Sequence, residues 1–153
     1  MQMRFSMKTE YGVRAILELA ANRPRGALHS AEIARRRRIP GPFLDQVLMI
    51  LRRGGLVQSV RGPRGGHLLA RAPAEIRLDE VIACLEGAGE TPAEKGESSD
   101  SSVLSSVSRE AELAARRVFA SHTVEDLLRE QREEPPVFHG IFHPVSGRTP
   151  RRG

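Results

Sequence analysis

The stretch PFLDQVLMILRRGGLVQSVRGPRGGHLLA, residues 42–70, decides the fold of this chain. Apolar residues in its first half follow the i, i+3, i+4, i+7 spacing of an amphipathic helix: Leu44, Val47, Leu48 and Leu51. Pro42 suits the first helical position, and Gly54 or Gly55 suits the end. This spacing therefore predicts a helix with one buried face and one outward face.

The second half of the same stretch predicts a β-hairpin. Residues 56–60 and 67–70 are typical of two short strands, and the turn 61–66 between them is rich in glycine. A glycine-rich loop can also cradle a nucleotide phosphate, but this one lacks the Gly-Lys-Ser/Thr ending and opens no helix directly. We therefore interpret it as the tip of a hairpin.

Two further helices are predicted before residue 42. The first carries apolar residues at helical spacing: Tyr11, Ala15, Ile16, Leu19 and Ala20. Ser6 or Thr9 is available as its N-cap. The second is expected to begin under a cap from Ser30 and to end in solvated cations: Arg35, Arg36, Arg37 and Arg38. The order helix, turn, helix, hairpin is that of a winged helix-turn-helix.

After the hairpin, the pattern predicts one short helix, a loop and a longer helix. The short helix carries Leu78, Val81, Ile82 and Leu85 on one face and ends near Gly87. The longer helix has an apolar stripe: Leu104, Val107, Ala111, Ala114, Ala115 and Val118. Thr123 and Asp126 resemble a capping box for a last helix. The fold class is mainly α with a small β-hairpin wing. We expect a winged domain at 1–86, a flexible loop at 87–102, a dimerisation helix and C-terminal helix at 103–133, and a disordered tail at 134–153.

Composition limits the possible functions. A chain of 153 residues is the length of one domain, which excludes a large multidomain enzyme. It shows no apolar run long enough to span a membrane and no secretory signal, so a soluble cytoplasmic protein without a membrane partner is expected. Residues 1–77 hold 15 Lys and Arg against 5 Asp and Glu, whereas residues 78–153 hold 9 against 14. The basic half favours nucleic acid as partner.

The outward face of the helix at 42–53 has the chemistry of a DNA-reading surface. A carboxylate can accept from cytosine, an amide can pair with adenine and a guanidinium can bind guanine or phosphate. The arginines of the glycine-rich turn fit a minor groove or a phosphate track. The alternatives are an ordinary solvated helix face and a plain surface turn. The candidate DNA-binding residues are Lys8, Pro42, Asp45, Gln46, Met49, Arg53, Arg61, Pro63 and Arg64.

Four motifs resemble the Rrf2 family of bacterial winged helix-turn-helix transcription regulators. They are MRFSMKTEYGVRA (3–15), FLDQVL (43–48), LRRGGLV (51–57) and VRGPRGGHLLAR (60–71). The resemblance implies a homodimer whose long helix crosses to its partner and which reads a near-palindromic operator in double-stranded DNA. It implies base contacts at Pro42, Asp45 and Gln46, wing contacts around Arg61, and dimer contacts through the apolar stripe at 104–118. It also suggests a partner enzyme as the source of the signal. The alternative is a small-molecule effector bound between the winged domain and the long helix.

The chain departs from this family where the resemblance implies an iron–sulfur cluster. Members with a cluster hold it with three cysteines around the start of the long helix, but residues 97–106 read ESSDSSVLSS. Glu10 matches a position that supplies a carboxylate ligand in some relatives. Without thiolates, a surface or salt-bridge role for Glu10 is favoured, and we expect no cofactor. The remaining alternative is a cluster regulator whose cysteines were replaced by serine.

The other candidate groups give no sign of catalysis or metal binding. Cys84 is favoured as an inert thiol of the short helix over a redox switch. His139 and His143 are four residues apart, but Gly140 and Pro144 argue against a helix that would bring them together. No metal site, catalytic residue or enzyme activity is expected. A basic RNA- or ribosome-binding module, or an interaction protein that no longer reads DNA, are the competing functions.

Overall fold

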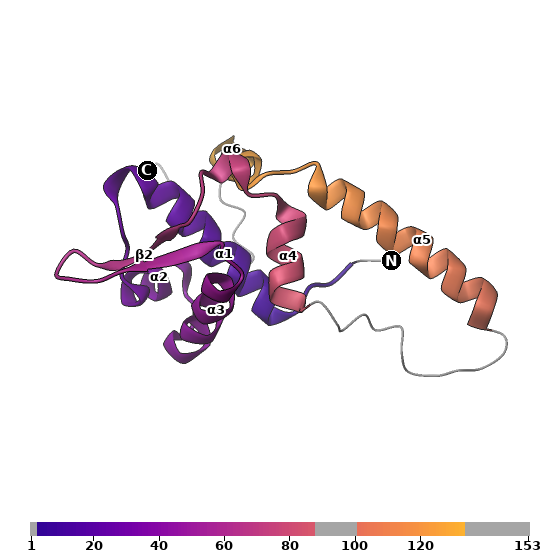
Figure 1. The fold of residues 1–153 in the computed structure, drawn as a ribbon, viewed down its shortest axis with the longest axis horizontal. Coiled ribbons are helices and arrows are strands. Elements are labelled where there is room, and N and C mark those ends of the chain that lie inside the picture. Colours follow the sequence, from indigo (N-terminus) through magenta and orange to yellow (C-terminus); the bar gives the residue numbers. More distant parts are fainter. Residues whose placement is uncertain (1–2, 88–100, 134–153) are drawn as a thin grey trace, which may run out of the picture.

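The computed structural model describes residues 3–87 and 101–133, and all statements on structure concern these residues (Figure 1). The elements in chain order are α1 (Met7–Asn22), η1 (Arg23–Arg25), α2 (Ser30–Arg37), α3 (Gly41–Arg53), β1 (Val57–Val60), β2 (Gly66–Leu69), η2 (Pro73–Glu75), α4 (Leu78–Glu86), α5 (Ser101–Ala120) and α6 (Val124–Glu133). The expected winged helix-turn-helix is confirmed. In this part of the chain no helix has the length and apolarity that a membrane crossing requires.

The buried face of α3 is the one that its sequence spacing predicts. The four apolar residues at 44, 47, 48 and 51 are 0–2% exposed. They pack in one core with Ile16 and Leu19 of α1, Ile33 of α2 and Leu85 of α4. Because this single core holds all four helices, the direction of the opposite face of α3 is fixed by packing.

The start of α1 is held by hydroxyl groups. Ser6 is the N-cap, and its Oγ accepts a hydrogen bond from the Thr9 amide at 3.2 Å. The Thr9 side chain is buried instead of capping, and its Oγ1 donates to the carboxylate of Glu86 on α4. Ser6 Oγ donates to the same carboxylate at 3.0 Å. These hydrogen bonds, that of Thr9 first, hold the pKa of Glu86 below its ordinary value.

Two helix starts differ from expectation. Ser30 is not a cap: α2 begins at Ser30 itself, and the preceding residue, His29, is the N-cap without a side-chain hydrogen bond. The His29 carbonyl accepts from the amides of Glu32 and Ile33, so the first turn already includes Ser30. Pro42 is the second residue of α3 and not the first, because the Pro40 carbonyl accepts from the Leu44 amide at 2.9 Å.

The hairpin is attached to the segment before α2. Strands β1 and β2 are antiparallel, with Val57 opposite Leu69 and Val60 opposite Gly66. The outer edge of β2 also pairs with Leu28, whose amide donates to the His67 carbonyl at 2.9 Å and whose carbonyl accepts from the His67 amide at 2.8 Å. Gly66 has φ 139°, and a Cβ there would lie 2.5 Å from the Leu28 carbonyl oxygen. Only glycine fits this close approach.

The chain beyond the hairpin leaves the core and then returns to it. Figure 1 shows α5 extending away from the other helices, whereas α6 lies back against α1 and η2. Val124 of α6 is 1% exposed and belongs to the same core as α1–α4. The expected division at residue 102 groups α6 with α5, but packing places α6 with the winged unit. Helix α5 also begins at Ser101, two residues before the expected start.

The predicted capping box of the last helix is present. The Thr123 amide donates to Asp126 Oδ2 at 2.9 Å, and the Asp126 amide donates to Thr123 Oγ1 at 3.1 Å. The first residue of α6 is also fixed to the winged unit, because the Val124 amide donates to the Ile76 carbonyl at 2.8 Å. The start of α6 is thus determined both by its own side chains and by the core.

Candidate nucleic-acid interface

The outward face of α3 is solvent-accessible along its length. Its exposed residues are Pro42, Asp45, Gln46, Met49, Arg52 and Arg53. Within the described residues, the side chains of Asp45, Gln46 and Arg53 make no hydrogen bond or ion pair. A carboxylate, an amide and a guanidinium on one rigid helix face are free to meet the edges of bases in a major groove.

The wing loop, residues 61–65, carries two arginines at the tip of the hairpin, which projects beyond the helices (Figure 1). Arg61, Pro63 and Arg64 are exposed, and the loop is closed by the Gly65 amide, which donates to the Gly62 carbonyl at 2.9 Å. A Cβ at Gly65 would lie 2.3 Å from the Val60 carbonyl oxygen, so this tight turn requires glycine. The loop therefore holds its arginines on a short and well-defined backbone.

A side-chain link that the sequence analysis missed joins α3 to the hairpin. Arg52 Nη1 donates to Ser59 Oγ at 3.2 Å, and Ser59 Oγ lies 3.5 Å from His67 Nδ1. Asp45 and Met49 border the hollow between helix and hairpin, which has a volume of about 230 Å³. Burial first, and then the charge of Arg52, lowers the pKa of His67, so its ring is uncharged at neutral pH. The link holds the hairpin at a fixed position relative to α3.

Helix α1 supports the start of α3 through aromatic rings. Tyr11 and Phe43 meet nearly edge to face, with ring centroids 5.2 Å apart, and the Arg14 guanidinium carbon lies 5.6 Å from the Tyr11 centroid. Lys8 lies on the first turn of α1, half-buried, and its charge acts on Glu86 of α4. The candidate residues thus lie on three elements: the outward face of α3, the wing loop at the tip of the hairpin that packs on α3, and, for Lys8, the first turn of α1.

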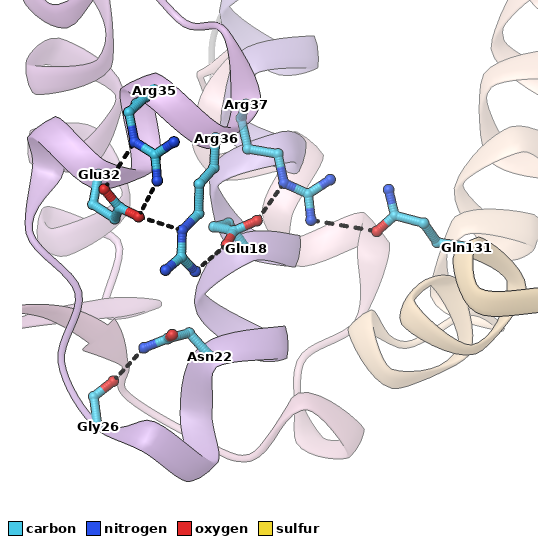
Figure 2. A network of polar contacts seen from close by, with 8 residues as sticks. All are labelled: Glu18, Asn22, Gly26, Glu32, Arg35, Arg36, Arg37 and Gln131. Atoms are coloured by element: carbon cyan, nitrogen blue, oxygen red, sulfur yellow. Dashed lines mark hydrogen bonds and ion pairs between the residues drawn. The ribbon is translucent and has the colours of Figure 1, made fainter. Parts of the chain in front are cut away.

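The prediction that α2 ends in solvated arginines is correct only in part: Arg35 and Arg38 are exposed, but Arg36 and Arg37 bind an acid of α1. Glu18 of α1 is only 8% exposed and accepts hydrogen bonds from Arg36 Nη1 at 3.0 Å and from Arg37 Nε at 2.6 Å. Figure 2 shows both guanidinium groups pointing toward this carboxylate. Arg35 and Arg36 both bind Glu32, and these hydrogen bonds lower the pKa of Glu32 to about 2. The guanidinium groups of Arg36 and Arg37 therefore link α2 to α1.

The apolar stripe of α5 faces solvent in this single chain. Leu104, Val107 and Val118 are between 55% and 70% exposed, and Ala111 and Ala114 are also exposed, with Ala115 half-buried. A helix that stands away from its own core with an uncovered apolar stripe has the form of an interface element. The stripe lies on the element that the sequence analysis assigned to dimerisation.

A helix-turn-helix whose second helix presents a polar outward face, followed by a hairpin with arginines at its tip, defines the winged helix-turn-helix class. The chain belongs to the Rrf2 family, described as iron-dependent transcriptional regulators: the family model matches residues 5–130. Members of this family are transcription regulators and not enzymes. Both the fold and the family that the sequence motifs indicated are confirmed.

Two named relatives are similar to this chain in sequence. A protein of Synechocystis sp. named as an HTH-type transcriptional regulator is 44% identical over 84 residues, which are 55% of this chain and 57% of that protein. IscR of Escherichia coli O1:K1 is 40% identical over 84 residues, 55% of this chain and 52% of IscR. The matched region is thus little more than half the length of these relatives.

Solved structures match over more of the chain. IscR of T. potens superimposes with a TM-score of 0.73 at 34% identity and covers 86% of this chain and 90% of its own. CymR, the global cysteine regulator of B. subtilis, superimposes with a TM-score of 0.68 at 29% identity and covers 84% of this chain and 98% of its own.

The family description, which names iron dependence, raises the question of an iron–sulfur cluster. The side chains of this chain do not fit one. The whole sequence holds one cysteine, Cys84, and its Sγ donates to the Ile50 carbonyl at 3.5 Å. Burial raises the pKa of this thiol, which disfavours the thiolate that a cluster iron requires. Glu10 instead lies 3.8 Å from Arg14 on the exposed face of α1, as expected of a surface salt bridge. His139 and His143 lie outside the described residues.

Proposed function

We propose that this chain is a sequence-specific DNA-binding transcription regulator that acts as a homodimeric repressor on a near-palindromic operator, without an iron–sulfur cluster. The observation that carries the proposal is the outward face of α3. Its Asp45 and Gln46 side chains are exposed and uncommitted within the described residues, on a helix whose other face is buried. Such a helix can enter a major groove and read base edges without rearranging the core.

The wing supplies the second half of the interface. When α3 lies in a major groove, the neighbouring loop is positioned to meet the adjacent backbone or minor groove, where Arg61 and Arg64 can bind phosphates. Pro63 restricts the loop between these two arginines. Contacts of this kind add affinity for any sequence, so base preference rests on α3.

The homodimer is supported by α5. The stripe from Leu104 to Val118 is apolar and uncovered, and a second copy of the same stripe is the simplest surface that can bury it. Two α3 helices related by a two-fold axis would read two half-sites, which is why the operator is expected to be near-palindromic. A dimer seated over a promoter blocks RNA polymerase without any further contact, which favours repression.

The main alternative, a basic module that binds RNA without sequence choice, would draw on the arginines of α2. Arg36 and Arg37 are engaged by Glu18, so they are not available as a basic patch. The α3 face, by contrast, is uncommitted. The structure therefore favours DNA reading over the alternative.

Competition binding on a footprinted site from the chain's own promoter region tests the proposal. Gln46→Ala and Asp45→Ala should each reduce discrimination between cognate and mutated sites by about 1–3 kcal/mol. Arg61→Ala and Arg64→Ala should instead weaken binding to all sequences and reduce the salt slope by about one unit each. Unchanged discrimination in both α3 variants would refute the DNA-reading role of α3. Val107→Glu should yield monomers in sedimentation, whereas Arg109→Gln, on the opposite side of α5, should not.

A further inference from the structure

A cavity of about 600 Å³ lies between the C-terminal end of α1 with η1, the short helix η2, and α6. It is lined by Ala20, Arg23, Pro24, Pro73, Glu125, Leu128, Arg129 and Arg132. None of these lining residues belongs to α3 or to the wing loop, so the cavity is separate from the proposed DNA-reading surface. Its volume is in the range of about 300–1,000 Å³ that small-molecule sites occupy.

The charges of this cavity are unbalanced. Three guanidinium groups, those of Arg23, Arg129 and Arg132, share it with one carboxylate, that of Glu125. Within residues 3–87 and 101–133, the side chains of Arg23 and Arg132 make no ion pair or hydrogen bond. Arg129 makes only a loose contact of 3.7 Å with Asp126, and its side chain is 62% exposed. The cavity is therefore a cationic site that lacks a matching anion.

The contrast with other arginines of the chain strengthens this interpretation. Arg36 and Arg37 are held by Glu18, and Arg71 is held by Glu80 at 2.5 Å. In these three cases, an arginine that lies between two elements forms an ion pair with a carboxylate. Between α1 and α6, however, arginines of both elements face one shared space, over walls of Ala20, Pro24, Pro73 and Leu128. Guanidinium forks above apolar walls are suited to carboxylate or phosphate groups on a short apolar body.

We propose that this cavity binds a small organic anion, with a carboxylate or phosphate group held between Arg23 and the two arginines of α6. Such a ligand would add a contact between α1 and the second half of α6. The start of α6 is fixed by Val124, but its second half is held to α2 by a 3.4 Å hydrogen bond from Arg37 to Gln131. The anion would fasten this half of α6 to α1. Its use as a regulatory signal rests on the proposed function, whereas its binding does not.

Calorimetric titration of the full chain without DNA tests the site. The probes are succinate, glycerol 3-phosphate and inorganic phosphate, at constant ionic strength set with chloride. Succinate or glycerol 3-phosphate should bind with a dissociation constant below about 1 mM. The stronger of the two identifies the preferred headgroup, and weaker binding of inorganic phosphate shows that the apolar body contributes.

Matched variants separate the cavity from general surface charge. Arg23→Gln and Arg132→Gln should each weaken the organic probe at least about tenfold. Arg25→Gln in η1 and Arg116→Gln in α5 remove exposed arginines outside the cavity and should leave binding unchanged. Absence of binding by both organic probes would overturn the proposal. Equal losses in the Arg23 and Arg25 variants, or none in the Arg23 variant, would do the same.

Measuring the binding of operator DNA by the same variants separates the anion site from the proposed function. Without anion, Arg23→Gln and Arg132→Gln should bind operator DNA with the wild-type salt slope, because neither arginine lies on α3 or the wing loop. If the wild-type chain bound the probe but no DNA, the proposed function would fail while the anion site stood. If it bound DNA but neither organic probe, only the anion site would fail.

Discussion

Replacing Glu18 by glutamine tests the network of Figure 2. The Glu18 side chain is 10% exposed and accepts two charged hydrogen bonds, from Arg36 and from Arg37. Glutamine keeps the size of the side chain, but its one oxygen can serve only one guanidinium, and its amide group then faces the other. The variant therefore leaves a partly buried cation without its counter-charge.

The loss of stability caused by Glu18→Gln lies between the values for buried and exposed ion pairs. Removing one partner of a fully buried pair costs about 3–5 kcal/mol, whereas exposed pairs contribute about 0.2–1 kcal/mol. Arg37 is 19% exposed and Arg36 is 34% exposed. Arg36 retains Glu32, and Arg37 retains Gln131. We therefore expect Glu18→Gln to lower the free energy of unfolding by about 2 kcal/mol at pH 7.

The effect of pH provides an independent check. Burial raises the pKa of Glu18, but the hydrogen bonds and charges of Arg36 and Arg37 outweigh burial and hold this pKa below its ordinary value. A lowered pKa in the folded state stabilises the fold above the unfolded pKa, and this contribution is lost as pH falls toward the folded value. The difference between wild type and variant should therefore shrink below about pH 4.

Urea unfolding at one fixed protomer concentration measures both effects, because a dimer's stability depends on concentration. Glu10→Gln is the matched control. Its carboxylate lies 3.8 Å from Arg14 with both side chains nearly half-exposed, so its loss should cost less than about 0.5 kcal/mol. A Glu18 variant as stable as this control at pH 7, or an equal deficit at pH 7 and pH 3, would refute the reasoning.

Two further variants test local packing and capping. A Cβ at Gly54 would lie 2.3 Å from Cys84 Sγ, so Gly54→Ala should destabilise by about 1–2 kcal/mol, and Cys84→Ala in the same chain should recover most of this loss in urea unfolding. Equal losses with and without the thiol would contradict this contact. Thr123→Ala removes one half of the capping box and should cost about 1 kcal/mol in thermal unfolding. Ser121→Ala is the control and should cost less, because the exposed Ser121 hydroxyl donates to the Val118 carbonyl at the end of α5.

The elements that could be predicted from sequence are those whose signals are local. Helix α3 follows from four apolar residues at one helical spacing, and the hairpin follows from a glycine-rich turn between two short runs. The capping box at Thr123 is a pattern of only four residues. Each of these depends on residues close together in the chain, where periodicity and turn chemistry act directly. The outward face of α3 could be predicted for the same reason.

The features that could not be predicted depend on residues far apart in sequence. Nothing near Glu18 indicates that it would bind Arg36 and Arg37, and four consecutive arginines are typical of a solvated helix end. The link between Arg52, Ser59 and His67 needs the register of the hairpin against α3. A cap at Ser30 predicts that α2 begins one residue too late. The helix begins at Ser30 itself, because the His29 carbonyl accepts hydrogen bonds from the Glu32 and Ile33 amides.

The charge boundary of the sequence and the packing boundary of the fold are different. Charge divides the chain near residue 77, but α6, which lies in the acidic half, buries Val124 in the core of the basic half. Arg37 then bonds to Glu18 of α1 and to Gln131 of α6 at once. Since α6 packs on α1 and α1 packs directly on α3, a displacement of α6 would act first on a helix that supports α3. The acidic half is therefore mechanically part of the proposed DNA-binding unit, apart from α5, whose stripe faces outward.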